Sequence, residues 1–240
     1  MSNKLDQRIF KKIRDANKKY ELIATGDKVA VGMSGGKDSM ALLHYIMMLQ
    51  EYTPLSFQVQ PVYIDLGWGN DISVLTAFCK HAGVNLFMEK TNIRDIINDQ
   101  EQMQSPCSLC ANLRRGALNR TAKKLGCNKV ALGHHLNDVT STWLMSIAFE
   151  GRFRVFKPKT YLNRIDIEVI RPLIYVSEKE ISSFMAARAL QPVQNLCPVE
   201  GKTQRAFIGH VLQELESKIP NINVKIMSAL EKIDNQSFWL

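Results

Sequence analysis

Short apolar runs alternate along the chain with longer segments in which apolar residues recur every three or four positions. The short runs predict buried strands, and the periodic segments predict helices. Strands are expected at 29–31, 57–64, 84–88, 130–132 and 167–170, and helices at 4–20, 40–49, 71–82 and from Asp138 to about Phe149. This alternation is typical of an α/β fold with a doubly wound, parallel, five-stranded sheet, whose ligands bind at the carboxyl ends of the strands. We therefore expect the loops after the first, second, fourth and fifth strands to form one site.

Composition indicates a soluble protein with a polyanionic partner. The 240 residues, 45% hydrophobic and 22% charged, suit one globular domain with a full core. There is no apolar run long enough to span a membrane and no apolar core of a signal peptide, so a cytoplasmic protein is expected. Five cysteines, an odd number, favour free thiols or metal ligands over disulfides. The net charge of +8 favours a partner such as nucleic acid.

No internal repeat or low-complexity linker divides the chain, so one domain is the economical interpretation. Residues 1–27 are expected to form a basic helix packed on the domain. Residues 28–200 form its core with a cysteine-bearing loop, and 201–240 form C-terminal helices of the same domain. The first helix sets Lys and Arg between regularly spaced apolar residues, which fits a docked helix and an RNA-facing surface equally well.

The first strand ends in a glycine-rich turn that runs directly into a helix, Ser34-Gly35-Gly36-Lys37-Asp38-Ser39. Free N–H groups and the dipole at a helix N-terminus attract phosphate, and the two glycines let the backbone approach an anion. Serine hydroxyls and the lysine charge add donors. The spacing differs from a Walker A loop and from the dinucleotide fingerprint. It resembles the PP-loop of the ATP pyrophosphatases, which implies that these six residues hold the pyrophosphate of ATP.

Cysteine spacing points to a metal centre. Cys107 and Cys110 stand at the start of a predicted helix, where both thiolates reach the same side and the dipole favours their anionic form. Cys197, in a loop far along the chain, is the third candidate, whereas Cys79 and Cys127 lie in apolar contexts and read as core residues. On spacing alone, an iron–sulfur cluster with an open iron, a zinc site completed by His or water, and a metal-free redox pair all stay open.

The order of the motifs resembles that of the TtcA family, the tRNA-cytidine 2-sulfurtransferases. The likeness extends from about Phe10 to Asp234 and includes Ser34 to Ser39, Cys107 to Gly116, Gly133-His134-His135, Arg171-Pro172-Leu173, Asn195-Leu196-Cys197 and the tail from Arg205. It implies the PP-loop ATP pyrophosphatase fold, which is adenine nucleotide α-hydrolase-like and Rossmann-like. It also implies a 4Fe-4S cluster on Cys107, Cys110 and Cys197, and AMP-forming conversion of cytidine 32 in the tRNA anticodon loop to 2-thiocytidine.

The same resemblance implies roles for further residues and partners. Asp38 would place Mg²⁺, and Asp138 would assist at the reacting centre. Gly133 would lie at the nucleotide, and adenine would lie against the exit of the second strand at Tyr63 and Asp65. Family members commonly pair as homodimers and act with a sulfur donor, either a cysteine desulfurase or sulfide. The chain departs from the family at Asn137, where an Asp is usual, so a metal or base role there is in doubt.

Two basic features and three functions remain open. Arg114, four residues past Cys110, is interpreted as a contact to phosphate or the bound base, or as a solvated helix charge. Residues 151–159 set four basic residues among two aromatics, which suits RNA phosphates and a splayed base, or a plain surface hairpin. The alternatives to cytidine thiolation are a PP-loop enzyme thiolating another nucleoside or small molecule, an amide or lysidine synthetase, and a metal-stabilised RNA-binding module without catalysis.

Overall fold

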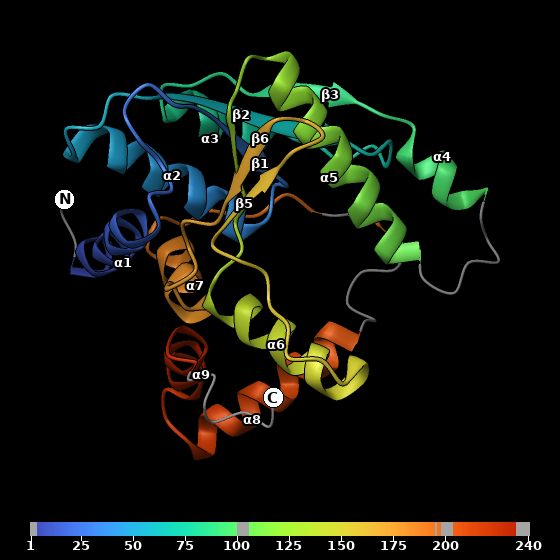
Figure 1. Ribbon diagram of the computed structural model, residues 1–240. Coiled ribbons are helices and arrows are strands. Elements are labelled where there is room, and N and C mark those ends of the chain that lie inside the picture. Colours follow the sequence, from blue (N-terminus) through green and yellow to red (C-terminus); the bar gives the residue numbers. More distant parts are fainter. Residues whose placement is uncertain (1–3, 100–105, 195, 198–203, 234–240) are drawn as a thin grey trace.

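The computed structural model describes residues 4–99, 106–194, 196–197 and 204–233. They form one sheet with helices packed on both faces (Figure 1). The strand order is β3-β2-β1-β4-β6-β5, and all neighbours are parallel except β5 and β6. The strands are β1 (Lys28–Met33), β2 (Gln58–Asp65), β3 (Phe87–Lys90), β4 (Lys129–Ala131), β5 (Lys159–Leu162) and β6 (Ile167–Ile170).

The predicted α/β class is confirmed, and the strand count of five was wrong. The additional strand, β5, pairs antiparallel with β6 and places Lys159 opposite Ile170. Because β5 is an edge strand, its residues are exposed or half-buried, and Tyr161 is 57% exposed. It therefore lacks the continuous apolar run that marks strands buried on both faces.

The described helices match the predicted ones and include two that the periodicity did not reveal. They are α1 (Lys4–Tyr20), α2 (Lys37–Tyr52), α3 (Ser73–His81), α4 (Ile93–Asn98), α5 (Pro106–Lys124), α6 (Leu136–Glu150), α7 (Glu178–Ala187), α8 (Gln204–Lys218) and α9 (Ile222–Glu231). Of these, α4 and α7 were not predicted, because short helices show little periodicity. None of the described helices is long and apolar enough to cross a membrane.

Alternate strand residues face two separate apolar cores, as a pleated sheet requires. In β1, Val29, Val31 and Met33 belong to the core shared with α1, α2 and α7, whereas Ala30 belongs to the core under α4 and α5. Figure 1 shows α1, α2 and α7 together on one side of the sheet and α5 on the other, with α6, α8 and α9 grouped beyond them. The central strand β1 is thus covered on both faces, which fixes the position of the loop that follows it.

The N-terminal helix α1 docks on α2 and α7. Its apolar stripe is buried, and Ile9 and Ile13 are fully covered. Asp6 accepts a hydrogen bond from Tyr45 of α2 at 3.0 Å and pairs with Arg188 at 2.7 Å. Lys12 pairs with the buried Glu180 of α7 at 2.7 Å. The same helix keeps most of its other lysines and arginines exposed.

Candidate active site

The carboxyl ends of β1 and β4 lie side by side where the strand order reverses, since the chain runs outward from β1 to β3 and then returns to β4 on the other side of β1. Open α/β sheets bind ligands at such a point. Gly133, in the loop after β4, comes so close to the start of α2 that a Cβ there would lie 3.1 Å from the backbone carbonyl of Asp38. A side chain at position 133 would push against this backbone, so the glycine allows the two loops to lie this close.

The PP-loop, or phosphate loop (Ser34 to Ser39), follows β1 and runs into α2, and its shape suits an anion. Gly35 has a φ of +83°, and a Cβ there would lie 2.7 Å from the Cβ of Val193. The Gly36 N–H donates to the Ser34 hydroxyl at 3.3 Å, and the Ser39 hydroxyl donates to the Gly36 carbonyl at 2.8 Å. Helix α2 has no side-chain cap at its N-terminus. Its free N–H groups are therefore available to a phosphate.

Two charged side chains extend from the first turn of α2. Lys37 Nζ lies 3.1 Å from Glu178 Oε1 and 3.6 Å from Asp38 Oδ1. Burial works to lower the pKa of Lys37, but Asp38 and Glu178 outweigh it and hold the pKa above its ordinary value. Burial also raises the pKa of Asp38, and the nearby Asp138 and Glu178 add to this while His135 and Lys37 oppose it. Lys37 therefore stays charged, and Asp38 lacks full compensation.

Asp38 has the features of a cation ligand. Its Oδ1 is buried and has no hydrogen-bond partner among the described residues. A buried carboxylate oxygen without a donor is costly unless a positive charge compensates it. Oxygen ligands of this kind suit Mg²⁺, which binds through one or two carboxylates and substrate phosphates. The residues present thus fit a magnesium ion beside the phosphate loop.

Asp138 lies in the first turn of α6, on the other side of the His135 ring from Asp38. The His135 N–H donates to its Oδ2 at 3.0 Å, and Arg205 of α8 approaches its Oδ1 at 3.1 Å. The His135 ring lies between the two carboxylates, with Nε2 3.6 Å from Asp38 and 3.5 Å from Asp138. Asp38, Asp138 and His135 therefore form one cluster that joins the loops after β1 and β4.

The Asn137 side chain makes a structural contact with α7. Its Oδ1 accepts a hydrogen bond from the backbone N–H of Glu178 at 2.9 Å. Glu178 is the first residue of α7, where backbone N–H groups otherwise lack partners. The side chain at 137 thus supports the start of α7, and an Asp at this position would offer the same acceptor.

The loop that carries Cys197 is held against the phosphate loop. The Val193 N–H donates to the Gly35 carbonyl at 2.9 Å, and the Leu196 N–H donates to Asn70 Oδ1 at 3.1 Å. Cys107 is exposed near the start of α5, while Cys110 and Cys197 are half-buried. Asn195 of the same motif lies outside the described residues. The chain thus brings the third cysteine to the edge of the sheet that carries the PP-loop.

Cys107 and Cys197 lie within electrostatic reach of Cys110. Burial raises the pKa of Cys110, Arg114 opposes it, and Cys197 and Cys107 raise it further. No three His, Cys, Asp or Glu side chains in the described part of the chain lie close enough to hold a metal ion. A four-iron cluster binds each thiolate to a different iron, so it needs the sulfurs farther apart than one ion does. The influence of Cys107 and Cys197 on Cys110, with the positive charge of Arg114 acting on the same thiol, fits such a cluster. The other two cysteines, Cys79 and Cys127, are buried in the cores, as predicted.

The adenine-side candidates lie at the exit of β2. Tyr63 is buried, and its hydroxyl accepts a hydrogen bond from Asn70 at 3.4 Å. The Asp65 carbonyl accepts from both the N–H and the hydroxyl of Thr91, and its carboxylate accepts from the Gly67 N–H. The Asp65 groups are therefore already engaged in shaping the loop after β2.

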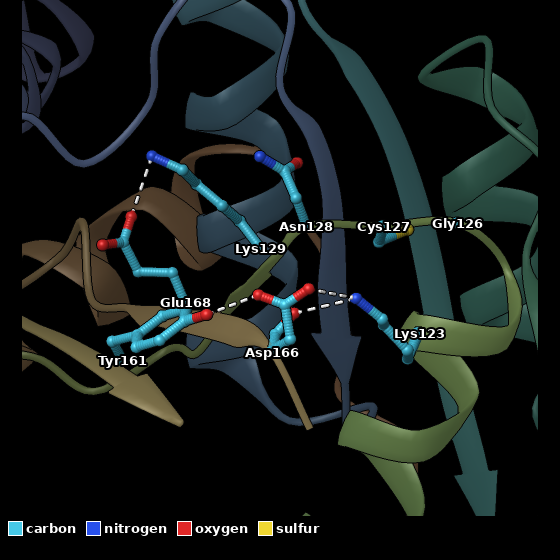
Figure 2. A pocket seen from close by; sticks show the side chains of 8 residues that line it. All are labelled: Lys123, Gly126, Cys127, Asn128, Lys129, Tyr161, Asp166 and Glu168. Carbon is cyan, nitrogen blue, oxygen red and sulfur yellow. Dashed lines mark hydrogen bonds and ion pairs between the residues drawn. The ribbon is translucent and has the colours of Figure 1, made fainter. Parts of the chain in front are cut away.

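Figure 2 shows a separate hollow at the amino-terminal ends of the strands. It has a volume of about 370 Å³ and is lined by Lys123, Gly126, Cys127, Asn128, Lys129, Tyr161, Asp166 and Glu168. Its charged groups compensate one another, because Lys123 pairs with Asp166 at 2.7 Å and Lys129 pairs with Glu168 at 3.0 Å. These residues stand at the amino-terminal ends of β4 and β6, away from the phosphate loop. The hollow therefore does not belong to the candidate active site.

Three residues at the site were missed from the sequence. Glu178 pairs with Lys37, Arg205 pairs with Asp138, and Arg171 donates to His134 Nδ1 at 3.3 Å. Arg171 and Arg205 belong to motifs noted for the family resemblance, but nothing in their local sequence shows which side chain they meet. The contacts arise only when the loops after β4 and β6 and helix α8 come together.

Comparison with known proteins is consistent with this geometry. A family profile described as a PP-loop domain matches residues 3–215. The chain is 37% identical over 237 residues to the tRNA-cytidine(32) 2-sulfurtransferase of Geobacter sulfurreducens, covering 95% of this chain and 92% of that one. It is 34% identical over 235 residues to the enzyme of that name from Neisseria meningitidis, covering 97% and 74%.

Among solved structures, the U34-tRNA thiolase NcsA from Methanococcus maripaludis, determined with its 4Fe-4S cluster, is similar with a TM-score of 0.76 and 23% identity. That similarity covers 96% of this chain and 80% of the thiolase, and it establishes the fold. The family profile spans most of the chain, and the curated relatives match it almost end to end. The chain therefore belongs to the PP-loop family of tRNA-cytidine(32) 2-sulfurtransferases.

Proposed function

We propose that this chain is an ATP-dependent tRNA sulfurtransferase that converts cytidine 32 of the anticodon loop to 2-thiocytidine and forms AMP. The observation that carries the proposal is that the phosphate loop, the Asp38–Asp138 cluster and the loop with Cys197 meet at the carboxyl ends of β1 and β4. This chemistry requires an activated nucleobase and a sulfur source at one place. The family membership supports the same function.

The first step activates the cytidine. Oxide is a poor leaving group, whereas the C2 oxygen leaves readily once it carries AMP. The N-terminus of α2, with Ser34, Gly35, Gly36, Lys37 and Ser39, would hold the β- and γ-phosphates of ATP while that oxygen attacks the α-phosphate. Lys37 stays charged for this role because of its carboxylate neighbours. The phosphates would take the place of Glu178 beside it.

The two carboxylates would serve the reacting centre. Asp38, whose buried Oδ1 accepts no hydrogen bond from the described residues, would hold Mg²⁺, which supplies the charge that offsets the developing negative oxygens. Asp138, oriented by the His135 N–H and by Arg205, would act beside the base and the α-phosphate. Gly133 lets these groups approach the nucleotide, and the adenine would lie at the exit of β2 near Tyr63 and Asp65.

Cys107, Cys110 and Cys197 would hold a 4Fe-4S cluster, whose open iron supplies a Lewis-acidic position for sulfide. Arg114, whose charge acts on Cys110, would stabilise an anion at the cluster side of the crevice. Sulfide would come from a cysteine desulfurase or from free sulfide. A homodimer and a cytoplasmic location complete the proposal.

The test is an anaerobic comparison of the wild type with Cys197→Ala, using Cys127→Ala as a matched loss of one thiol in the core. The wild type and Cys127→Ala should carry the visible absorption of an iron–sulfur cluster and make 2-thiocytidine, as mass analysis of tRNA nucleosides shows. Cys197→Ala should lose both while still binding ATP. Product formation by Cys197→Ala at the wild-type rate would refute the cluster role. Binding of tRNA without AMP formation by the wild type would instead identify an RNA-binding module.

A further inference from the structure

Arg171 is an unusually buried cation at the carboxyl end of β6. It directly follows β6 and is only 9% exposed. Its Nε donates to His134 Nδ1 at 3.3 Å, its Nη1 donates to the Lys157 carbonyl at 2.7 Å, and the guanidinium lies 4.9 Å from the centre of the Phe156 ring. Its Nη2 makes no hydrogen bond within the described residues. One edge of the guanidinium is thus fixed by protein, and one nitrogen is left for a ligand.

No carboxylate compensates this charge. Within the described part of the chain, Arg171 forms no ion pair with Asp or Glu, although buried arginines are normally paired. Burial, together with the like charge of Arg115 on α5, lowers the pKa of Arg171 to about 10. Arg115 is exposed, and its Nη2 donates a hydrogen bond to Oδ1 of Asn112, a neutral side chain, at 3.3 Å. Two guanidinium groups therefore repel each other where an anion would relieve the cost.

This pair lies beside the reacting centre. Burial lowers the pKa of His134 to about 4, while Asp138 opposes the shift and Arg171 and Arg205 add to it. His134 is therefore neutral at physiological pH, so its Nδ1 can accept the hydrogen bond from Arg171. The same ring is within electrostatic reach of Asp138. An anion held by Arg171 would thus lie near the position proposed for the cytidine.

We infer that Arg171 binds a phosphate group, with Arg115 adding positive charge to the site, and we assign that phosphate to the RNA backbone next to the target cytidine. The inference rests on the proposed function. A planar guanidinium suits the two oxygens of a phosphodiester. The nucleotide has its own donors at the start of α2, whereas Arg171 is anchored to the segment 151–158, which carries the exposed Arg152, Phe153 and Arg154. That segment offers single-stranded RNA a path toward the crevice.

The test measures binding of an anticodon stem-loop RNA at several salt concentrations for the wild type, Arg171→Gln, Arg171→Lys and Arg115→Gln. Arg164→Gln is the matched control, because it removes an exposed arginine from the β5–β6 turn at the opposite edge of the sheet. Loss of one phosphate contact should lower the slope of log K against log salt by about 0.7 to 0.9. We expect this loss in Arg171→Gln and Arg115→Gln, with affinity about tenfold weaker. Arg164→Gln should match the wild type.

The lysine variant separates the charge from the guanidinium geometry. Arg171→Lys should recover the salt slope but not the full affinity, because an ammonium cannot form the two-pronged contact. Slopes of Arg171→Gln and Arg115→Gln equal to that of Arg164→Gln would overturn the inference, since Arg115 is on the surface and its loss leaves the fold intact. Weaker ATP binding with an unchanged RNA slope would place the phosphate on the nucleotide and overturn the RNA assignment. If the wild type binds RNA but makes no 2-thiocytidine, the proposed function fails. The salt slopes of RNA binding still test the phosphate contact of Arg171 in that case.

Discussion

The contact between α1 and α7 gives the sharpest test of the physical reasoning. Glu180 has a side chain only 8% exposed, and it receives Lys12 at 2.7 Å and Arg8 at 3.1 Å. It also accepts hydrogen bonds from the N–H and the hydroxyl of Ser177 at 2.8 and 2.9 Å, which caps the start of α7. Replacing Glu180 with Gln keeps the shape and removes the charge.

The size of the effect follows from the exposure of the partners. Breaking a fully buried ion pair costs about 3–5 kcal/mol because one charge is trapped without compensation. Here Lys12 is 32% exposed and Arg8 is 61% exposed, so both can turn to water. We therefore expect Glu180→Gln to lower the free energy of unfolding by about 2 kcal/mol, most of it from charge-assisted hydrogen bonds. In a chain of this length that corresponds to a melting temperature lower by about 4–8 °C.

The pH dependence has a definite sign. Burial works to raise the pKa of Glu180, but Lys12 and the Ser177 groups outweigh it and hold the pKa below its ordinary value of 4.5. The stabilisation is therefore fully present above that ordinary value and is lost as the pH falls through the lower folded value. Thermal melts of the wild type and Glu180→Gln should thus differ most at neutral pH and converge in acid.

Glu214→Gln is the matched control, because Glu214 and its partner Lys218 are each 70% exposed and their ion pair contributes little. It should melt within about 1 °C of the wild type. If Glu180→Gln also melts within that range, the buried ion-pair cluster does not stabilise α1 on α7, and the reasoning from burial is wrong.

Two further variants test the site. Lys37→Met should weaken ATP binding by about 10- to 150-fold through loss of a charge-assisted contact to phosphate, measured by titration calorimetry, while Glu178→Gln, which frees Lys37, should not weaken it. Asn137→Ala should lower the free energy of unfolding by about 1 kcal/mol through loss of the acceptor for the first N–H of α7, and Asn137→Asp should restore it in urea titrations. A stable Asn137→Ala variant that has lost AMP formation would instead make Asn137 a catalytic residue.

The parts of the fold that local sequence encodes were predictable. Strands such as Val29 to Val31 are apolar on both faces and end in the glycine loop, and α1 shows a clean apolar stripe, so both were found. Edge strand β5 was missed, because its exposed face carries no hydrophobic run. Helix α7 also escaped the periodicity, although Ser177 followed three residues later by Glu180 is a readable capping box.

The same distinction between local and long-range features applies to the candidate active site. The phosphate loop is one continuous motif, so its residues could be named from the sequence. The charged partners at the site could not be named in this way, because Glu178 lies far along the chain from Lys37, and Arg205, the partner of Asp138, lies on α8. An ion pair between distant residues is decided by the packing of whole elements, and a single sequence carries no record of which ones meet.

The pairing of these charges suggests how the site accepts its ligands. Lys37 and Glu178 are 33% and 44% exposed, and Asp138 and Arg205 are 23% and 49% exposed, so both ion pairs are screened by water and cheap to open. Phosphate can replace Glu178 at Lys37, and a divalent cation can replace Arg205 at Asp138, so that each group is replaced by one of the same sign of charge. Asp38 Oδ1 is different, because it is buried and accepts no hydrogen bond from the described residues, and Lys37 and His135 come no closer to it than 3.6 Å. Of the acidic groups at this edge, Asp38 therefore gains most from a bound cation, and the order of binding should begin with the metal and nucleotide together at the phosphate loop.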